Sequence, residues 1–289
     1  MRWTPGGRSA DIEDRRGMRV RRGPALGLGG FLILLVLSVL FKQDLFQLVG
    51  GGADVGQPIG VPGSEEAGIP PGASSPEEEQ LVQFMSFVLD DAQDTWSRIF
   101  TAEGETYQRA RLVLFTDATN SGCGYAQSAM GPFYCPLDRK VYLDLGFFRE
   151  LHDRFGAPGD FAQAYVVSHE LGHHVQNLLG VAEQVQRLQR DNPGTANQLS
   201  VLMELQADCL AGVWAHSTQE RQILDLGDLE EGLAAASAVG DDRIQRQTTG
   251  YVAPESWTHG SSEQRMTWFR RGLESGRVDQ CDTFASLVR

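Results

Sequence analysis

Two histidines and a glutamate in the stretch SHELGHHVQ, residues 168–176, have the types and the spacing of a catalytic metal site. His169 and His173 are four positions apart, so on a helix both imidazoles project from one face. Imidazole nitrogen is a preferred zinc ligand, and two such ligands on one helix supply half of a tetrahedral site. Glu170 is placed to take a proton from the attacking water and return it to a leaving amine. This H-E-x-x-H pattern predicts a zinc-dependent hydrolytic centre with one zinc per chain.

A catalytic zinc site needs a third protein ligand, which this motif does not contain. Residue 179, where the metzincin spacing would place another histidine, is Leu. Glu204 and Asp208, in MELQADCLAG, are i and i+4 on one predicted helix face, so both can point into the same cleft. Glu204 best completes a His-His-Glu ligand set with one open position. Asp208 is expected to accept a hydrogen bond from a ligand imidazole, and it is also the alternative third ligand.

Three further residues are candidates for supporting roles near this site. His174 points about 100° round the helix from the second ligand, so it is expected to pack against or support the ligands rather than bind the metal. His259, in a loop before a predicted helix, and Tyr251 are candidates to donate to a developing oxyanion. Helix entry and capping is the alternative role of His259. Asp241 and Asp242 are expected to be a solvated or capping pair.

Helices and a small sheet must position these residues, and the apolar periodicity predicts where they lie. A helix over residues 160–180 would carry the first motif, with Asp160 as N-cap and Gly180 as its stop. A long helix over residues 196–218 would carry the second pair. The fold is therefore expected to be α+β, mostly helical, with a small mixed sheet before the active-site helix. The other expected helices cover residues 75–100, 146–156, 182–190, 226–246 and 261–274, and the expected strands are 109–117 and two or three short segments of 121–145.

The composition of the amino-terminal part predicts a membrane anchor. Residues 1–23 contain seven arginines, and residues 24–41 are an uncharged apolar run near the lower limit for spanning a bilayer. This order predicts a single transmembrane helix over 24–41, with its basic tail in the cytoplasm and the catalytic domain outside, in the periplasm or beyond the cell. A cleaved signal peptide is the alternative. Residues 42–76, rich in Gly, Pro and Ser, are expected to be a flexible linker, and residues 77–289 the catalytic domain.

The charge balance excludes one class of partner. The formal charge is −13, and the seven arginines of residues 1–22 face three acidic residues, which leaves −17 for the rest of the chain. Nucleic acid is not expected as a partner, because phosphate binding needs a basic face. The expected partners are a protein or peptide substrate and the lipid bilayer, through residues 24–41. The sequence does not indicate an oligomeric state.

The four cysteines predict disulfides rather than a cysteine metal site, because no C-x-x-C pair occurs. An even count in an oxidising compartment favours two disulfides. Of the three possible connectivities we favour Cys123–Cys135, which would close a hairpin-like loop, with Cys209–Cys281, which would tie the C-terminal tail to a helix. Four buried free thiols are the alternative.

Several segments together resemble one bacterial family, whose members are described as "putative neutral zinc metallopeptidases". The segments are SHELGHHVQ, ELQADCLAGVWA, FYCPLDRKVYLDLGFF, GDDRIQ and HGSSEQRMTWF. The resemblance covers residues 76–289 nearly continuously, and the apolar anchor and the opening MRW match as well. It implies a gluzincin-type site, ligated by two histidines and a glutamate, on a membrane-anchored zincin fold with endopeptidase chemistry. Substrates do not follow from it.

The zincin resemblance also suggests where an extended substrate would bind. In zincins a strand at the upper edge of the sheet lies along the cleft, and its main chain pairs with the substrate. The segments KVYLDL (140–145) and GYAQSAM (124–130) are the candidates for this strand.

The leading hypothesis is a zinc metalloendopeptidase in which Glu170 is the general base. One alternative is a catalytically silent zinc-binding scaffold or adaptor of envelope proteins. Glu170 argues against it, because a structural zinc site is usually closed by four ligands and needs no base. A zinc hydrolase of a non-peptide envelope substrate is the other alternative.

Overall fold

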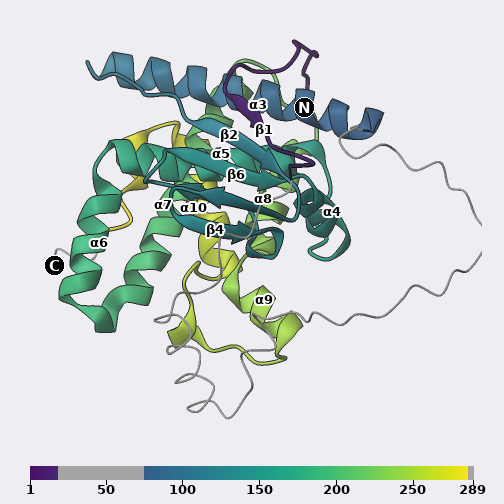
Figure 1. The fold of residues 1–289 in the computed structure, drawn as a ribbon. Helices are drawn as coiled ribbons and strands as arrows, with labels where there is room; N and C mark the ends of the chain where they lie inside the picture. The colour runs from purple at the N-terminus through teal and green to yellow at the C-terminus, as the bar shows by residue number, and fades with distance from the viewer. Residues whose placement is uncertain (19–74, 286–289) are drawn as a thin grey trace, which may run out of the picture. The chain divides into compact units, whose positions relative to one another are not determined.

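A mixed sheet of four strands precedes the motif helix in the computed structural model, which describes residues 1–18 and 75–285 (Figure 1). The strand order is β1-β2-β6-β5, in which β1, β2 and β6 are parallel and β5 is the antiparallel edge strand. A separate antiparallel hairpin consists of β3 and β4. The strands are β1 (Ile12–Asp14), β2 (Arg111–Phe115), β3 (Ala118–Ser121), β4 (Gly124–Gln127), β5 (Phe133–Cys135) and β6 (Lys140–Asp144).

The side chains of β2 alternate between two hydrophobic clusters, because successive residues of a strand point to opposite faces of the sheet. Leu112 and Leu114 lie in the main core, together with buried residues of the helices α3 and α5. Val113 and Phe115 pack on the opposite face with Tyr142 of β6. Both faces of this central strand are therefore covered, which explains its nearly continuous apolar sequence.

The helices agree in position with most of the predicted ones, and three of them carry the residues of interest. The H-E-x-x-H motif lies on α5, and Glu204 and Asp208 lie on α7. The loop that contains His259 leads into α10, which begins with a capping box formed by Ser261 and Gln264. α5 begins at Asp160, so its N-cap is Gly159 rather than the predicted Asp160. The helices are α3 (Pro76–Ala102), α4 (Gly146–Asp153), α5 (Asp160–Leu178), α6 (Val181–Asp191), α7 (Ala196–Glu220), α8 (Asp228–Ala238), α9 (Asp241–Thr248) and α10 (Ser262–Ser275).

The amino-terminal residues 1–18 belong to the same compact unit as residues 75–285. Strand β1 pairs with β2 in parallel, with Ile12 opposite Leu112. Trp3 adds an apolar contact, since its ring lies 5.2 Å from that of Phe84 in α3. This segment thus extends the sheet and covers part of the core.

Two of the arginines on which the anchor prediction rested form ion pairs within the folded domain. A guanidinium nitrogen of Arg8 lies 2.8 Å from the carboxylate of Glu79 in α3. That of Arg2 lies 2.7 Å from Asp225, just before α8. Arg2 and Arg8 are therefore matched by carboxylates far away in the sequence, whereas Arg15 and Arg16 pair with the nearby Glu13 and Asp14.

The predicted single-pass arrangement is corrected by two findings. A strand cannot lie across a bilayer from the sheet that it joins, so residues 1–18 are not a cytoplasmic tail of an extracytoplasmic catalytic domain. In addition, none of the helices within residues 1–18 and 75–285 has both the length and the apolar character needed to cross a membrane. The run 24–41, on which the anchor prediction rested, and the predicted linker as far as residue 74 lie outside the described residues.

Both favoured disulfides are formed, and all four cysteines are paired. The S–S distance is 2.06 Å in Cys123–Cys135 and 2.00 Å in Cys209–Cys281. The first joins the loop after β3 to the edge strand β5, and the second joins α7 to the C-terminal segment. The alternative of four free thiols is wrong.

Glycines allow α5, α7 and α10 to approach one another closely. A Cβ atom added to Gly172, inside the motif, would lie 2.8 Å from the carbonyl oxygen of Ala207 in α7. One added to Gly212 would lie 2.1 Å from the carbonyl oxygen of Phe269, and one added to Gly272 would lie 1.9 Å from a backbone oxygen of α7. The contact at Gly172 explains the glycine inside the motif helix and sets the distance between α5 and α7.

Replacing Gly172 with alanine should destabilise the protein, although alanine is ordinarily the better helix former by about 1 kcal/mol. The new methyl group would press on the backbone of α7, and overpacking of this kind typically costs about 1–3 kcal/mol. Thermal or urea unfolding measures the change. Gly194→Ala is the matched control, because a Cβ atom there would meet nothing within 4 Å. Equal stabilities of the two variants would contradict the close-packing explanation.

Candidate metal centre

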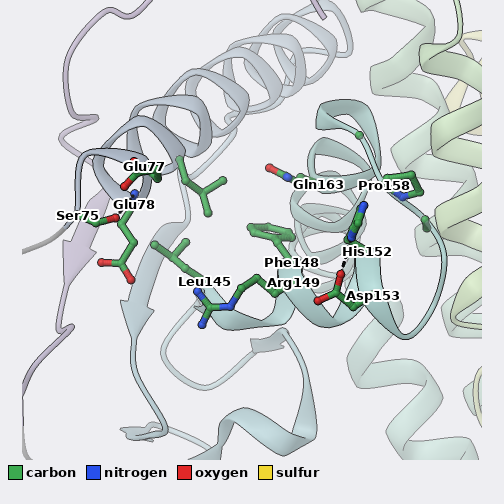
Figure 2. A pocket seen from close by; sticks show the side chains of 13 residues that line it. Ser75, Glu77, Glu78, Leu145, Phe148, Arg149, His152, Asp153, Pro158 and Gln163 are labelled. Carbon is green, nitrogen blue, oxygen red and sulfur yellow. Dashed lines mark hydrogen bonds and ion pairs between the residues drawn. The ribbon is translucent and has the colours of Figure 1, made fainter. Parts of the chain in front are cut away.

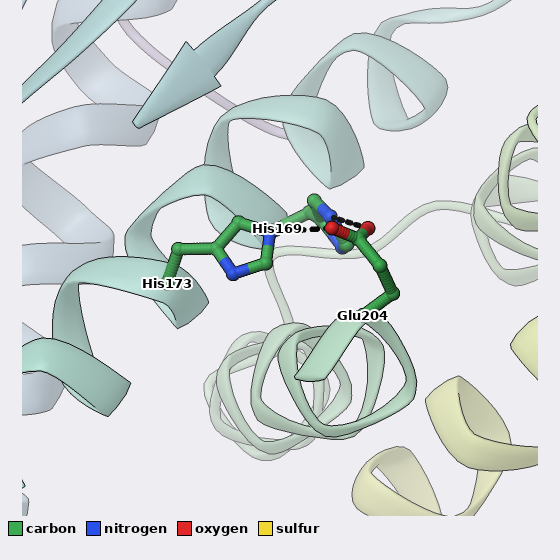
Figure 3. Close-up of side chains that lie close together, drawn as sticks. All are labelled: His169, His173 and Glu204. Atoms are coloured by element: carbon green, nitrogen blue, oxygen red, sulfur yellow. Dashed lines mark hydrogen bonds and ion pairs between the residues drawn. The ribbon is translucent and has the colours of Figure 1, made fainter. Parts of the chain in front are cut away.

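The two motif histidines and Glu204 meet between α5 and α7, with their polar atoms facing one another (Figure 3). The Nε2 atom of His169 lies 3.2 Å from Oε2 of Glu204. The Nε2 atom of His173 lies 3.3 Å from the other oxygen, Oε1, of the same carboxylate. All the candidate ligand atoms lie within 4.8 Å of one another. The structure therefore brings together the three residues that the sequence predicts as ligands.

The donor set and its spacing fit zinc. Two imidazole nitrogens and one carboxylate are the ligands of many catalytic zinc sites, which keep a fourth position for water or substrate. Around a tetrahedral ion at roughly 2.0–2.1 Å from each ligand, neighbouring ligand atoms lie roughly 3.3–3.4 Å apart. The distances of 3.2 and 3.3 Å are close to this value. A zinc ion would thus need little rearrangement of these side chains.

Asp208 supports the first histidine from behind. Its side chain is fully buried, and its Oδ1 atom lies 2.8 Å from Nδ1 of His169. Because a carboxylate accepts, Nδ1 carries a proton, and Nε2, which faces Glu204, is the nitrogen that would bind a metal once its own proton is displaced. The geometry thus gives Asp208 the predicted supporting position, while Glu204 occupies that of the ligand. Tyr165 also donates its hydroxyl to Asp208.

Arg265 of α10 completes this support and was not found from the sequence. Its Nε and Nη2 atoms donate to the two carboxylate oxygens of Asp208 at 2.8 and 2.9 Å. Its Nη2 atom lies 3.7 Å from Glu204. The sequence pattern could have indicated this role. Arg265, Phe269 and Leu273 follow one another at intervals of four and are all buried, so a charged residue lies on the apolar face of the helix.

Charge interactions at the site keep both carboxylates ionised. Burial raises the pKa of Glu204, but the imidazoles of His173 and His169 outweigh it and hold the pKa well below its usual range. Burial also raises the pKa of Asp208, and Arg265 and His169 outweigh that effect and lower it. In turn, Asp208 and Glu204 outweigh burial at His169 and raise its pKa to about 10. A cation that binds these imidazoles must therefore displace protons.

Glu170 lies next to the ligand pair and has the properties expected of a general base. It lines the same cavity as His169 and Glu204, and only 8% of its surface is exposed. Burial raises the pKa of its carboxyl group above the ordinary value. A raised carboxyl pKa suits a group that must both accept and return a proton near neutral pH.

The candidate ligands line a cavity of about 730 Å³. Besides the ionisable groups, its wall includes apolar side chains from several elements, which suits a substrate with apolar side chains. Strand β5 contributes the side chains of Phe133 and Tyr134 to this wall, and α4 contributes that of Phe147.

The edge of the sheet that borders this cavity is β5, which corrects one expectation. KVYLDL forms β6, which pairs with β2 on one side and β5 on the other, so it has no free edge for a substrate. GYAQSAM forms β4 and the short 3₁₀ helix η1 (Ser128–Met130), whose residues line the cavity. The strand available for main-chain pairing beside the cavity is therefore β5.

His259 lies on the wall of the cavity and is held there by Asp241. One oxygen of Asp241 lies 3.1 Å from Nδ1 of His259, and the other accepts backbone N–H groups from Thr258, His259 and Gly260. This bond to Asp241 raises the pKa of His259. Of the two roles expected for Asp241, solvated or capping, the solvated one is wrong, because its side chain accepts the backbone N–H groups of this loop. Tyr251 is 68% exposed and is not among the residues of the cavity wall.

His174 faces away from the ligands, as its place on the helix predicts. It is fully buried, with Nδ1 2.9 Å from the hydroxyl of Tyr134 and Nε2 2.6 Å from the carbonyl oxygen of Gln108. The carbonyl can only accept, so Nε2 carries the proton and Nδ1 accepts from Tyr134. His174 therefore connects α5 to the edge strand β5.

Two other clusters are weaker candidates for a site. A cavity of about 410 Å³ lies between the start of α3 and α4 (Figure 2), where His152 and Asp153 contact each other at 2.6 Å but are both largely exposed. Asp160, Asp228 and Glu231 form a carboxylate cluster at the start of α5 and α8. The amino group of Met1 already lies 2.9 Å from Asp160 in this cluster. Neither combines histidine ligands with a general base.

The motif, the cavity and the three grouped candidate ligands are those expected of a metallopeptidase of the H-E-x-x-H class. Residues 1–284 match the protein family described as "Putative neutral zinc metallopeptidase", and the chain belongs to this family. It is 45% identical over 295 residues to "Uncharacterized protein YpfJ" of Escherichia coli K12, with 100% of both chains covered. It is 49% identical over 191 residues to "Uncharacterized protein Rv2575" of Mycobacterium tuberculosis H37Rv, which covers 62% of this chain and 64% of that protein. No solved structure matches the chain.

Proposed function

We propose that this chain is a zinc-dependent peptidase that binds one zinc ion through His169, His173 and Glu204 and hydrolyses protein or peptide substrates. The observation that carries this proposal is the position of Glu170, a buried carboxyl group beside a His-His-Glu set on the wall of one cavity. Family membership supports the same chemistry. A scaffold function accounts for the ligands but gives no reason for a base beside them.

Each side chain of the site has a part in the proposed reaction. When bound, zinc supplies a Lewis acid that polarises the scissile carbonyl group and makes water a better nucleophile. Glu170 takes the proton from the attacking water and passes it to the leaving amine. His259, oriented by Asp241, is placed on the cavity wall to donate to the oxygen on which negative charge develops. The main chain of β5 offers an edge along which an extended peptide can pair.

Metal removal tests the proposed function directly. Treatment with a strong chelator should abolish hydrolysis of an unfolded protein such as reduced casein, and added zinc should restore it, because the attacking water loses its activation without the ion. Metal analysis of the untreated protein should give about one zinc per chain. Hydrolysis that survives complete zinc removal would contradict the proposal. Zinc binding without hydrolysis of any peptide in a diverse library would favour the scaffold or a non-peptide hydrolase.

The proposed donor, His259, makes activity depend on pH in a predictable direction. Its imidazolium form donates, and the bond to Asp241 raises its pKa, so activity persists to higher pH and is lost as the pH rises through that pKa. Asp241→Asn should lower the pKa and move the alkaline limb of the kcat/KM profile to lower pH. Asp242→Asn is the control, because Asp242 contacts Ser262 instead. Identical alkaline limbs in Asp241→Asn and wild type would remove His259 from this role.

A further inference from the structure

The second histidine of the motif has a support of its own, made of amide groups. Nδ1 of His173 lies 2.8 Å from Oε1 of Gln176, one turn further along α5. The side chain of Gln176 is fully buried. Its Nε2 atom donates to the carbonyl oxygen of Met203 at 2.8 Å and to Oε1 of Gln206 at 3.0 Å. Gln206 in turn donates from Nε2 to the carbonyl oxygen of Cys281 at 3.0 Å.

The direction of this chain of hydrogen bonds is fixed by two backbone carbonyl groups. A carbonyl oxygen can only accept, so Met203 and Cys281 require the NH₂ groups of Gln176 and Gln206 to face them. Each amide then presents its oxygen to the previous member of the chain. The oxygen of Gln176 therefore faces His173, and Nδ1 of that ring must carry a proton to donate to it.

With Nδ1 protonated, Nε2 of His173, which faces Glu204, is the nitrogen left to bind zinc through its lone pair when the metal is present. The two ligand histidines are thus held in the same tautomer by different means. A buried carboxylate with an arginine behind it, Asp208, orients His169. A neutral amide chain orients His173, so no second buried charge is needed there.

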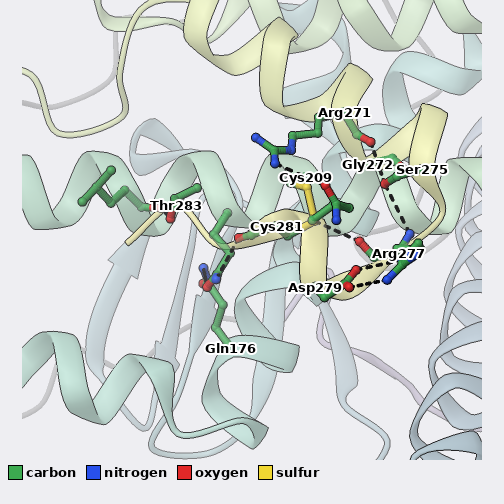
Figure 4. The surroundings of a disulfide bond; sticks show 12 residues. Gln176, Cys209, Arg271, Gly272, Ser275, Arg277, Asp279, Cys281 and Thr283 are labelled. Atoms are coloured by element: carbon green, nitrogen blue, oxygen red, sulfur yellow. Dashed lines mark hydrogen bonds and ion pairs between the residues drawn. A yellow bond between two sulfur atoms is a disulfide. The ribbon is translucent and has the colours of Figure 1, made fainter. Parts of the chain in front are cut away.

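The far end of the amide chain depends on a disulfide. Cys281 lies in the short 3₁₀ helix η4 (Val278–Cys281), and the bond to Cys209 fastens this segment to α7 (Figure 4). Both cysteines are buried, and they are 72 positions apart in the chain. Gln206 and Cys209 lie on the same helix, less than one turn apart, so the disulfide keeps the Cys281 carbonyl oxygen next to the Gln206 amide.

We infer that Gln176 and Gln206 are positioning residues that fix the tautomer of His173, and that the Cys209–Cys281 disulfide anchors their chain and thereby strengthens zinc binding. The inference rests on the proposed zinc site. It adds that the C-terminal segment, far from the H-E-x-x-H motif in sequence, contributes to metal affinity through its backbone.

The first test uses the purified chain and zinc alone, with a chromophoric chelator as competitor. Gln176→Leu should raise the zinc dissociation constant by about 10–100-fold, the usual cost of losing a support of a metal ligand. Gln176→Glu keeps an acceptor for Nδ1 but loses the donor to Met203 and Gln206, so it should recover only part of the affinity. Gln163→Leu, on the same helix at the other cavity, is the matched control. Equal zinc affinity of Gln176→Leu and wild type would overturn the inference.

The second test reads the tautomer without any metal. In the zinc-free chain at a pH where the ring is neutral, ¹⁵N NMR should show His173 protonated at Nδ1 in the wild type and a mixture of tautomers in Gln176→Leu and, more weakly, in Gln206→Leu. This result does not depend on catalysis or on zinc binding. The tautomer prediction can therefore fail while the proposed function holds, and the proposed function can fail while the tautomer prediction holds. An unchanged tautomer in both variants would overturn the role of the chain.

The third test compares the two disulfides. Removing Cys209–Cys281 by serine at both positions should weaken zinc binding by several-fold, since the Cys281 carbonyl is no longer fastened near Gln206. The corresponding double serine variant of Cys123 and Cys135 removes a disulfide that does not end at this chain, and its zinc affinity should stay at the wild-type value. Equal losses in the two double variants would overturn the anchoring role.

Discussion

Glu170→Gln should retain zinc and lose peptide hydrolysis. The amide has the shape of the carboxyl group but cannot take a proton from water, and general base catalysis typically contributes about 10²–10⁴-fold. We therefore expect kcat to fall by roughly 10³-fold, with KM nearly unchanged, because Glu170 is not part of the ligand set. The measurement combines metal analysis of the purified variant with initial rates on a peptide that the wild type cleaves.

The control for this variant is Glu183→Gln, at a largely exposed position on α6. It should be indistinguishable from wild type in zinc content and rate. Turnover by Glu170→Gln at the wild-type rate would show that another group is the base. Loss of zinc from Glu170→Gln would show instead that this residue is a ligand or is needed to fold the site.

The same variant separates the competing functions. A zinc-stabilised scaffold would give no hydrolysis in either form, and Glu170→Gln would leave partner binding intact. A hydrolase of a non-peptide substrate would lose that activity in Glu170→Gln although neither form cleaves peptides. Peptide cleavage that depends on Glu170 is expected only of the proposed peptidase.

The grouping of the candidate ligands could be predicted because it follows from the local periodicity of two helices. His169 and His173 share a helix face, as do Glu204 and Asp208, and no long-range information is needed to see either pair. The sequence alone left open whether the helices meet, and which member of the second pair faces the metal. Close contact at Gly172 decides the first point. The second depends on the crossing of α5 and α7, which places Glu204 at Nε2 of the ligand rings and Asp208 behind one of them.

Residues whose roles depend on long-range contacts were missed. Arg265 reaches Asp208 across 57 positions of sequence, through the crossing of α7 and α10 at paired glycines. Asp241 reaches the loop of His259 in a similar way, although its position at a helix start is equally typical of a cap. In each case the residue type was visible, but the partner that gives it a role was not.

The amino-terminal segment was misjudged for the same reason. β1 is three residues long, too short for an alternating pattern to reveal it. Arginines next to an apolar run are typical of a membrane anchor, and only the structure shows that Arg8 pairs with Glu79 in the folded domain.

Glu204→Ala should weaken zinc binding more than Asp208→Asn does, whereas Asp208→Asn should lower the stability of the protein more. Glu204→Ala removes a ligand, so the zinc dissociation constant should rise by more than the roughly 10–100-fold expected for a supporting residue. Asp208→Asn removes a support of one ligand, so its effect on zinc should stay within that range. Competition with a chelator measures both constants.

Asp208→Asn should be the less stable of the two variants, because Asp208 is the main partner of the buried Arg265. Breaking a buried ion pair by removing one partner costs about 3–5 kcal/mol, and Arg265 is only 3% exposed. The zinc-free Asp208→Asn protein should therefore unfold at lower denaturant concentration than zinc-free Glu204→Ala, in which Arg265 still holds Asp208. If Asp208→Asn instead empties the site while Glu204→Ala retains zinc, the two carboxylates exchange roles, and the third ligand is Asp208.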